Sequence, residues 1–210
     1  MVDTNKLRES LKLYLVTDSG ILKGRDFYKC IEDAIKAGVT MLQLREKNVD
    51  GKEFLEKAKK LRELTEKHNV SFIINDRVDI AQLVDADGVH VGQSDIDALS
   101  VRKLIGEDKI IGVSARSVEE AKVAKEMGAD YLGIGAMFST STKLDAKDVS
   151  FNTLNDMKNA VDLPFVLIGG ISLDNVSELK KFNPDGYALV SGILGAEDIE
   201  KRVKEWIEKI

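Results

Sequence analysis

The sequence predicts an α/β fold, in which short parallel strands alternate with helices. The first observation is that short apolar runs stop abruptly at polar clusters: residues 72–74 end at 75–77, and residues 88–91 end at 92–95. The second is that the segment between these runs has the apolar spacing of a helix, which is typical of βαβ units. The third is that this alternation continues along the chain without a break.

The expected elements follow one another in a regular order. Gly38 suits the end of the helix at 26–36, because glycine readily adopts the conformation that follows a helix C-terminus. Ser117 and Glu120 have the spacing of a capping box at the start of the helix at 117–127. The expected strands are 13–16, 39–44, 72–74, 88–91, 109–113, 131–134, 165–168 and 186–190. The helices expected after them are 26–36, 51–68, 80–83, 96–104, 117–127, 151–160, 174–182 and 197–209.

Eight strands alternating with eight helices predict a single (β/α)8 TIM barrel over residues 1–210, with a short N-terminal helix at 6–11. Pro164 and Pro184 fall in connections that enter strands, so neither interrupts an element. A doubly wound open sheet is the alternative, but that fold commonly has fewer strands. No linker or change in composition indicates a second domain. A short phrase rich in Ala, Asp and Gly recurs at strand entries, at 37–39, 86–88, 128–130 and 184–186.

Composition narrows the class of protein. A formal net charge of −5 gives no reason to expect nucleic acid or an anionic membrane as a partner. No apolar run is long enough to cross a bilayer, and the N-terminus lacks the apolar segment of a secretory signal. Cys30, the only cysteine, is expected to be a buried thiol in a reducing compartment. We therefore expect a soluble cytoplasmic protein, and association into a homo-oligomer stays open.

A pair of aspartates follows two neighbouring strands. Asp76 and Asp95 lie just after the runs at 72–74 and 88–91. Because parallel strands end at the same edge of a sheet, the two carboxylates are expected to approach each other. With a neighbouring Asn and Gln they form an oxygen-rich site that suits Mg²⁺. The alternative is that both aspartates cap the helices that follow them. In a barrel this edge carries the active site, which favours the metal.

Basic residues near the end of the second strand predict an anion site. Gln43 and Arg45 fall on one face of the strand, which points into a barrel, where both are costly unless paired. Arg45 suits the oxygens of a phosphate, and Lys47 adds a point charge. Ser114, at the end of the fifth strand, is a further candidate contact for a diphosphate. The alternative is an ion pair between Arg45 and a neighbouring acid.

A second, smaller anion site is expected at the ends of later strands. The loop at 138–143 is rich in hydroxyl groups and closes with Lys143, a composition that makes a phosphate cradle. Glycine-bearing turns follow the strands at 165–168 and 186–190, where this fold often binds phosphate. The alternatives are a solvated connection and simple tight turns. The candidate residues are Thr140, Ser141, Thr142, Gly170, Val190 and Ser191.

The motifs that carry these sites resemble one family. QLREK, INDR, HVGQSD, GVSAR, GADYLGIG, TSTK, IGGI and VSGI occur in the order and spacing of thiamine-phosphate synthases, over nearly the whole chain. The resemblance implies a transferase that joins hydroxymethylpyrimidine diphosphate to thiazole phosphate, gives thiamine phosphate and releases pyrophosphate. It also implies a dissociative mechanism, which needs no protein nucleophile or base. No Ser-His-Asp arrangement stands out in the sequence, and His90 is expected to be a core histidine.

The resemblance assigns a role to each matching residue. The pyrimidine diphosphate would be bound by Gln43, Arg45, Lys47, Asn75 and Ser114. Mg²⁺ would be held by Asp76 and Asp95. The thiazole phosphate would be held by Thr140, Thr142, Gly170, Val190 and Ser191. Lys143 would lie between the two anions and stabilise the departing pyrophosphate. The candidate catalytic residues are therefore Lys143, Arg45, Lys47 and Ser114.

Two other functions are compatible with the same fold. A thiazole tautomerase resembles the synthase, but it usually has a histidine where this chain has Arg116, and it departs from the Asp95 and TSTK patterns. A regulatory phosphate-binding barrel would not need a full set of metal and cation positions. The chain also departs from the synthases at Ala136 and Ser139, where that family usually has prolines.

Overall fold

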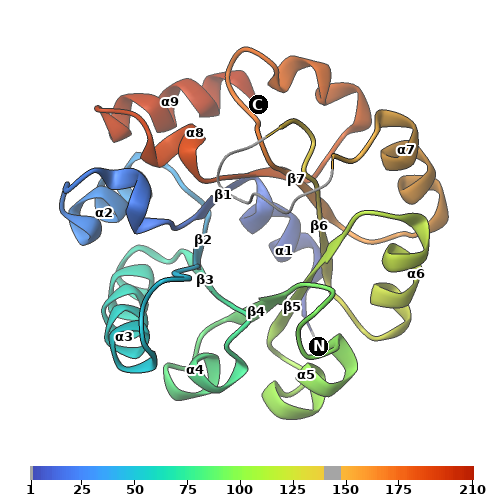
Figure 1. Ribbon diagram of the computed structural model, residues 1–210, viewed down its shortest axis with the longest axis horizontal. Coiled ribbons are helices and arrows are strands. Elements are labelled where there is room, and N and C mark those ends of the chain that lie inside the picture. Colours follow the sequence, from blue (N-terminus) through green and yellow to red (C-terminus); the bar gives the residue numbers. More distant parts are fainter. Residues whose placement is uncertain (1, 140–147) are drawn as a thin grey trace.

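A closed barrel of eight parallel strands forms the centre of the computed structural model, which describes residues 2–139 and 148–210 (Figure 1). Each strand pairs with the next along the chain, and β1 pairs with β8 to close the ring. The predicted TIM barrel is therefore confirmed. The strands are β1 (Leu13–Val16), β2 (Met41–Leu44), β3 (Ser71–Asn75), β4 (Gly88–Val91), β5 (Ile110–Ala115), β6 (Tyr131–Ile134), β7 (Phe165–Ile168) and β8 (Gly186–Leu189).

Helices surround this ring, as Figure 1 shows. The predicted cap of α6 is confirmed, because Oγ of Ser117 accepts the backbone N–H of Glu120 at 3.2 Å. The α-helices are α1 (Thr4–Leu11), α2 (Phe27–Ala37), α3 (Gly51–His68), α4 (Val78–Leu83), α5 (Ala98–Ile105), α6 (Val118–Glu126), α7 (Phe151–Ala160), α8 (Ser191–Leu194) and α9 (Ile199–Lys209). The 3-10 turns are η1 (Ser19–Leu22), η2 (Val176–Glu178) and η3 (Lys180–Phe182).

The helix predicted at 174–182 is wrong, because two 3-10 turns, η2 and η3, take its place between β7 and β8. The side chain of Asn175 accepts the N–H of Ser172 and donates to the carbonyl of Gly170, both at 2.9 Å. Such local bonds offer the backbone an alternative to a helix. Asn183 then adopts a φ of 46° immediately before Pro184, so the segment ends early.

The apolar residues form two separate clusters. The larger lies between the outer faces of the strands and the surrounding helices. The smaller fills the inside of the barrel, with Tyr14, Met41 and Tyr131 among its members. Leu7 and Leu11 of α1 belong to this inner cluster, so the leading helix closes the N-terminal end of the barrel. The interior is therefore filled at the N-terminal end of the barrel by these apolar side chains.

A repeated contact fastens the N-terminal end of the barrel. Asp87, Asp130 and Asp185 each precede an even-numbered strand, and each carboxylate accepts a backbone N–H of the preceding odd-numbered strand at 2.7 or 2.8 Å. Each carboxylate also pairs with an arginine. The N–H donors are Phe72, Ile111 and Phe165, and the arginines are Arg62, Arg102 and Arg8.

The fourth position of this repeat uses a hydroxyl in place of a carboxylate. Oγ1 of Thr40, just before β2, accepts the N–H of Leu13 at 2.9 Å and lies 2.8 Å from the carbonyl oxygen of Ser10. Every odd-numbered strand is thus held at its start by a side chain from the segment that enters the next strand. The phrase that recurs in the sequence at strand entries supplies three of these four contacts.

Cys30 is buried, as predicted, and burial raises the pKa of its thiol, which favours the protonated form. Among the helices of residues 2–139 and 148–210, none is long and apolar enough to cross a membrane.

Candidate active site

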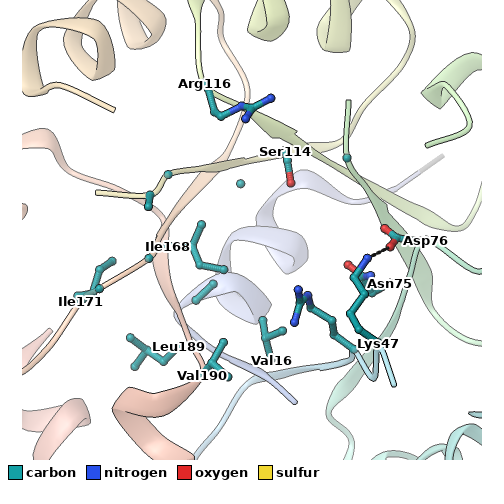
Figure 2. A pocket seen from close by; sticks show the side chains of 18 of the residues that line it. Val16, Lys47, Asn75, Asp76, Ser114, Arg116, Ile168, Ile171, Leu189 and Val190 are labelled. Carbon is teal, nitrogen blue, oxygen red and sulfur yellow. Dashed lines mark hydrogen bonds and ion pairs between the residues drawn. The ribbon is translucent and has the colours of Figure 1, made fainter. Parts of the chain in front are cut away.

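A cavity of about 420 Å³ opens at the C-terminal ends of the strands, where barrel enzymes place their active sites. Figure 2 shows a charged side with Lys47, Asn75 and Asp76, and an apolar side with Leu189 and Val190. The cavity brings together most of the residues that the sequence analysis selected. Those that line it are Arg45, Lys47, Asn75, Asp76, Asp95, Ser114, Gly170, Val190 and Ser191.

Arg45 is a cation on the charged side, and its backbone is held in place. It directly follows β2, and the fully buried Thr17 holds its backbone: the N–H of Arg45 donates to Oγ1 of Thr17 at 2.9 Å, and that hydroxyl donates back to its carbonyl at 3.3 Å. Within residues 2–139 and 148–210, no side chain pairs with the guanidinium of Arg45. The alternative of an ion pair with a neighbouring acid is therefore not observed among these residues, and the guanidinium is available to an anion.

Glu46, between Arg45 and Lys47, organises the neighbouring loops. Its buried carboxylate accepts the backbone N–H of Ser19 at 3.1 Å and also the hydroxyl of Ser19, and it lies 3.5 Å from Nζ of Lys57. These contacts tie the turn after β1 to α3. Because successive residues of an extended chain point in opposite directions, they leave the two flanking cations on the side of the cavity. This role of Glu46 was not predicted from the sequence.

Neither of the two aspartates caps a helix. The helix after β3, α4, has no side-chain cap, and α5 is capped by Asp97. Oδ2 of Asp76 lies 2.7 Å from Nζ of Lys47, and Oδ2 of Asp95 accepts the backbone N–H of Gly92 at 2.8 Å. The capping alternative is therefore wrong, and both carboxylates face the cavity rim instead.

The donor set at this rim fits the predicted Mg²⁺. Partial burial raises the pKa of Asp95 and the adjacent carboxylate of Asp76 raises it further, whereas the N–H of Gly92 and the charge of Lys47 lower it. A divalent cation would relieve the repulsion between the two carboxylates. Among the described residues, no cluster of three or more His, Cys, Asp or Glu side chains could hold a metal. Mg²⁺ commonly binds through one or two carboxylates and takes its other ligands from water and substrate phosphates.

Ser114 lines the cavity, whereas Gln43 lies inside the barrel. The amide Nε2 of Gln43 donates to the hydroxyl of Tyr14 at 2.7 Å, and Gln43 is buried. Oγ of Ser114 lies 2.9 Å from Nε2 of His90, which is itself buried, as predicted for a core histidine. Gln43 is not among the residues that line the cavity. Its contact with a substrate therefore stays a prediction.

Backbone groups dominate the opposite side of the cavity. Gly170 has a φ of 64°, and a Cβ at this position would lie 2.5 Å from the carbonyl oxygen of Phe138, so the turn requires glycine. The short helix α8 begins at Ser191 without a side-chain cap, so its first N–H groups have no partner within the helix. Nε1 of Trp206 donates to the carbonyl of Gly192 at 3.0 Å and holds this turn in place.

Arg116 lines the cavity, although it was not a predicted site residue; Figure 2 shows it above Ser114. The sequence could have indicated Arg116 as a site residue, because it lies two residues beyond Ser114 and so falls on the same side of an extended chain. Its guanidinium makes one weak pair, at 3.9 Å, with Glu120. Four predicted site residues lie outside the described residues: Thr140, Ser141, Thr142 and Lys143.

Comparison with known proteins gives consistent results. The family described as thiamine monophosphate synthase matches residues 13–193. A thiamine-phosphate synthase of Clostridioides difficile (strain 630) is 65% identical over 210 residues and is covered completely, as is this chain. A second thiamine-phosphate synthase, from Clostridium tetani, is 56% identical over 92% of both chains.

A solved structure has the same arrangement. Thiamine phosphate pyrophosphorylase from Pyrococcus furiosus superposes with a TM-score of 0.88 and 39% sequence identity, covering 96% of each chain. The family match to residues 13–193 includes all eight strands of the barrel.

Proposed function

Because the chain belongs to the thiamine monophosphate synthase family, and is thus a transferase that forms thiamine phosphate and releases pyrophosphate, we propose a specific reaction for its cavity. The substrates are 4-amino-2-methyl-5-(diphosphooxymethyl)pyrimidine and 4-methyl-5-(2-phosphooxyethyl)thiazole. The C–O bond to the diphosphate breaks first, the aminopyrimidine stabilises the methylene cation, and the thiazole nitrogen captures it. Residues 1–210 act as one barrel domain in this reaction.

The charged side of the cavity binds the diphosphate in this proposal. Arg45 is held by Thr17 and has no described side-chain partner, so its guanidinium can bind phosphate oxygens in a bidentate manner. Lys47 and Ser114 add an ammonium and a hydroxyl from neighbouring positions of the rim. Cations and donors placed in advance on a leaving group stabilise the charge that develops as the bond breaks.

Asp76 and Asp95 would hold Mg²⁺, which supplies positive charge to the leaving diphosphate. The support is the chemistry of the donor set: two adjacent carboxylates that cap no helix, with the amide of Asn75 beside them. The pair between Lys47 and Asp76 keeps the ammonium at the same rim. Asn75 and Gln43 are proposed to contact the pyrimidine diphosphate.

The opposite side binds the thiazole phosphate in the same proposal. The turn at Gly170 and the first N–H groups of α8, at Ser191, present backbone donors beside Val190. Thr140, Ser141 and Thr142 would add hydroxyls, and Lys143 would stabilise the departing pyrophosphate. These four roles are supported by the resemblance of the TSTK motif to the synthases.

The observation that carries the proposal is that one cavity has cations and carboxylates on one side and glycine turns with a helix start on the other. The test is to incubate the purified protein with both substrates, with Mg²⁺ or with excess EDTA, and to measure thiamine phosphate and pyrophosphate. Equimolar products that require Mg²⁺ are expected. Product formation at the same rate in EDTA would exclude the metal, and absence of product would exclude these substrates.

The order of bond breaking has its own test. An electron-withdrawing substituent on the pyrimidine ring destabilises a methylene cation, so turnover is expected to fall steeply with substituent strength in single-turnover reactions. A rate that is insensitive to the substituent would exclude the dissociative mechanism while leaving the overall reaction unchanged.

A further inference from the structure

Five polar side chains form a continuous line of hydrogen bonds through the barrel interior. The amide Nε2 of Gln43 donates to the hydroxyl of Tyr14 at 2.7 Å, and this hydroxyl lies 2.9 Å from that of Tyr131. The hydroxyl of Tyr131 lies 2.9 Å from Nδ1 of His90, and Nε2 of His90 lies 2.9 Å from Oγ of Ser114. The line starts on β2, passes through β1, β6 and β4, and ends on β5 at the cavity wall.

Two strand glycines provide the space that the rings of this line occupy. A Cβ on Gly112 would lie 2.2 Å from Cζ of Tyr131, and a Cβ on Gly133 would lie 2.9 Å from Cε1 of His90. A side chain at Gly112 would therefore overlap the Tyr131 ring. The backbone of β5 and β6 is thus adapted to the positions of these two rings.

The donor at one end determines the direction of every bond in the line. Because Nε2 of Gln43 can only donate, the hydroxyl of Tyr14 accepts from it and donates to Tyr131. Tyr131 in turn donates to Nδ1 of His90, which leaves the hydrogen of the neutral imidazole on Nε2. Burial raises the pKa of both tyrosines, so both hydroxyls keep the hydrogens that this direction needs.

We propose that Gln43, Tyr14, Tyr131 and His90 are positioning residues that make Ser114 a hydrogen-bond donor to the anionic group of the substrate. His90 donates from Nε2 to Oγ of Ser114, so the hydroxyl hydrogen of Ser114 is not used by this contact and is directed into the cavity. This inference rests on the proposed function, in which Ser114 contacts the diphosphate. The line uses one N–H of the Gln43 side-chain amide, and the second N–H and the side-chain oxygen Oε1 are proposed to make the predicted pyrimidine contact.

The opposite direction gives a different chemical state, so the two can be told apart. If the amide of Gln43 were turned round, Tyr14 would donate to its carbonyl and Tyr131 would accept from Nδ1 of His90. Nε2 of His90 would then accept the hydrogen of Ser114, and the serine would offer the substrate only lone pairs. A diphosphate carries lone pairs itself, so this direction opposes binding.

The first test measures the tautomer of His90 in the free protein. The chain has two histidines, so protein labelled with ¹⁵N-histidine gives two sets of ring signals, and His68→Gln assigns them. At about pH 8, where an ordinary imidazole is neutral, His90 is expected to carry its hydrogen on Nε2. In Tyr131→Phe, which lacks the donor to Nδ1, a mixture of tautomers is expected. A hydrogen on Nδ1 in the wild type would overturn the inference, and this measurement does not depend on any substrate.

The second test measures steady-state kinetics of the same variant. Tyr131→Phe is expected to raise KM for the pyrimidine diphosphate by about twofold to fivefold, in inverse proportion to the fraction of His90 that keeps its hydrogen on Nε2. KM for the thiazole phosphate is expected to stay unchanged. Tyr187→Phe is the matched control, because Tyr187 is a buried tyrosine of the outer cluster on β8. If Tyr187→Phe raised KM for the pyrimidine diphosphate as much as Tyr131→Phe, Tyr131 would have only a packing role. The same conclusion would follow if Tyr131→Phe raised KM for both substrates equally. A wild-type protein without synthase activity would instead exclude the proposed function.

Discussion

The two ends of the barrel use charged residues in opposite ways. At the N-terminal end, Asp87, Asp130 and Asp185 each accept a strand N–H and pair with an arginine, so each charge is matched within the fold. At the C-terminal end, the guanidinium of Arg45 has no partner among the described side chains, and the carboxylates of Asp76 and Asp95 lie beside each other with Lys47 paired to Asp76. The matched charges at the N-terminal end stabilise the barrel. The charges at the C-terminal end are positioned to bind a ligand of opposite charge.

This difference shows how the same residue types acquire separate roles. A buried or half-buried charge that is matched by hydrogen bonds contributes to stability, whereas one that is left unmatched costs stability and is retained where it binds or reacts. Charge removal should therefore lower stability at the N-terminal end and activity at the C-terminal end. Four substitutions test this contrast, in decreasing order of expected effect.

Asp95→Asn is expected to have the largest effect. The substitution keeps an oxygen that can accept the N–H of Gly92 but removes the charge that would hold Mg²⁺. We expect kcat/KM to fall on the order of 10³-fold, the scale of losing electrostatic stabilisation in the transition state, with no decrease in Tm. Steady-state assays across a Mg²⁺ titration and thermal unfolding provide the measurements. Activity within tenfold of the wild type would remove Asp95 from the metal site.

Arg45→Gln is expected to lower kcat/KM about 10²-fold, because one charge-assisted contact with the diphosphate is lost. Stability should stay the same, since no described side chain pairs with this guanidinium. Arg102→Gln is the matched control at the other end of the barrel, where the guanidinium pairs with Asp130. We expect the control to lose stability and keep kcat/KM. The contrast between the two ends would be wrong if both variants lost stability equally.

Asp130→Ala is expected to destabilise the fold by about 2 kcal/mol, because it leaves the N–H of Ile111 and the guanidinium of Arg102 without their shared acceptor. Urea denaturation measures the change, and kcat/KM below the unfolding transition should equal that of the wild type. A loss of activity in the folded variant would show that the N-terminal end also shapes the cavity.

Thr40→Val is expected to have the smallest effect, about 1 kcal/mol of stability, because a neutral hydroxyl replaces the carboxylate of the other three positions. Comparison with Asp130→Ala in the same urea experiment separates the contribution of charge from that of the strand N–H. Equal destabilisation by both substitutions would mean that the arginine pair adds nothing at these positions.

Much of the candidate site could be predicted from the sequence because it lies at strand ends. Asp76, Asp95 and Ser114 each follow an apolar run, and the parallel arrangement brings such positions to one rim. The helix predicted at 174–182 failed because the side chain of Asn175 bonds back to the turn before it, which no periodic pattern reveals. Asp87, Asp130 and Asp185 belong to the phrase that recurs in the sequence at strand entries, but their arginine partners are distant in sequence.

The sequence by itself determined the order of strands and helices, the closed barrel and the rim at which the polar residues gather. These features depend on local periodicity and on the rule that parallel strands end on the same side. Only the tertiary structure decided which groups meet: Gln43 with Tyr14, His90 with Ser114, and Lys47 with Asp76. Such pairs depend on distances across the ring between strands that are distant in sequence, and a hydrogen bond forms only when those distances are satisfied to within a few tenths of an ångström.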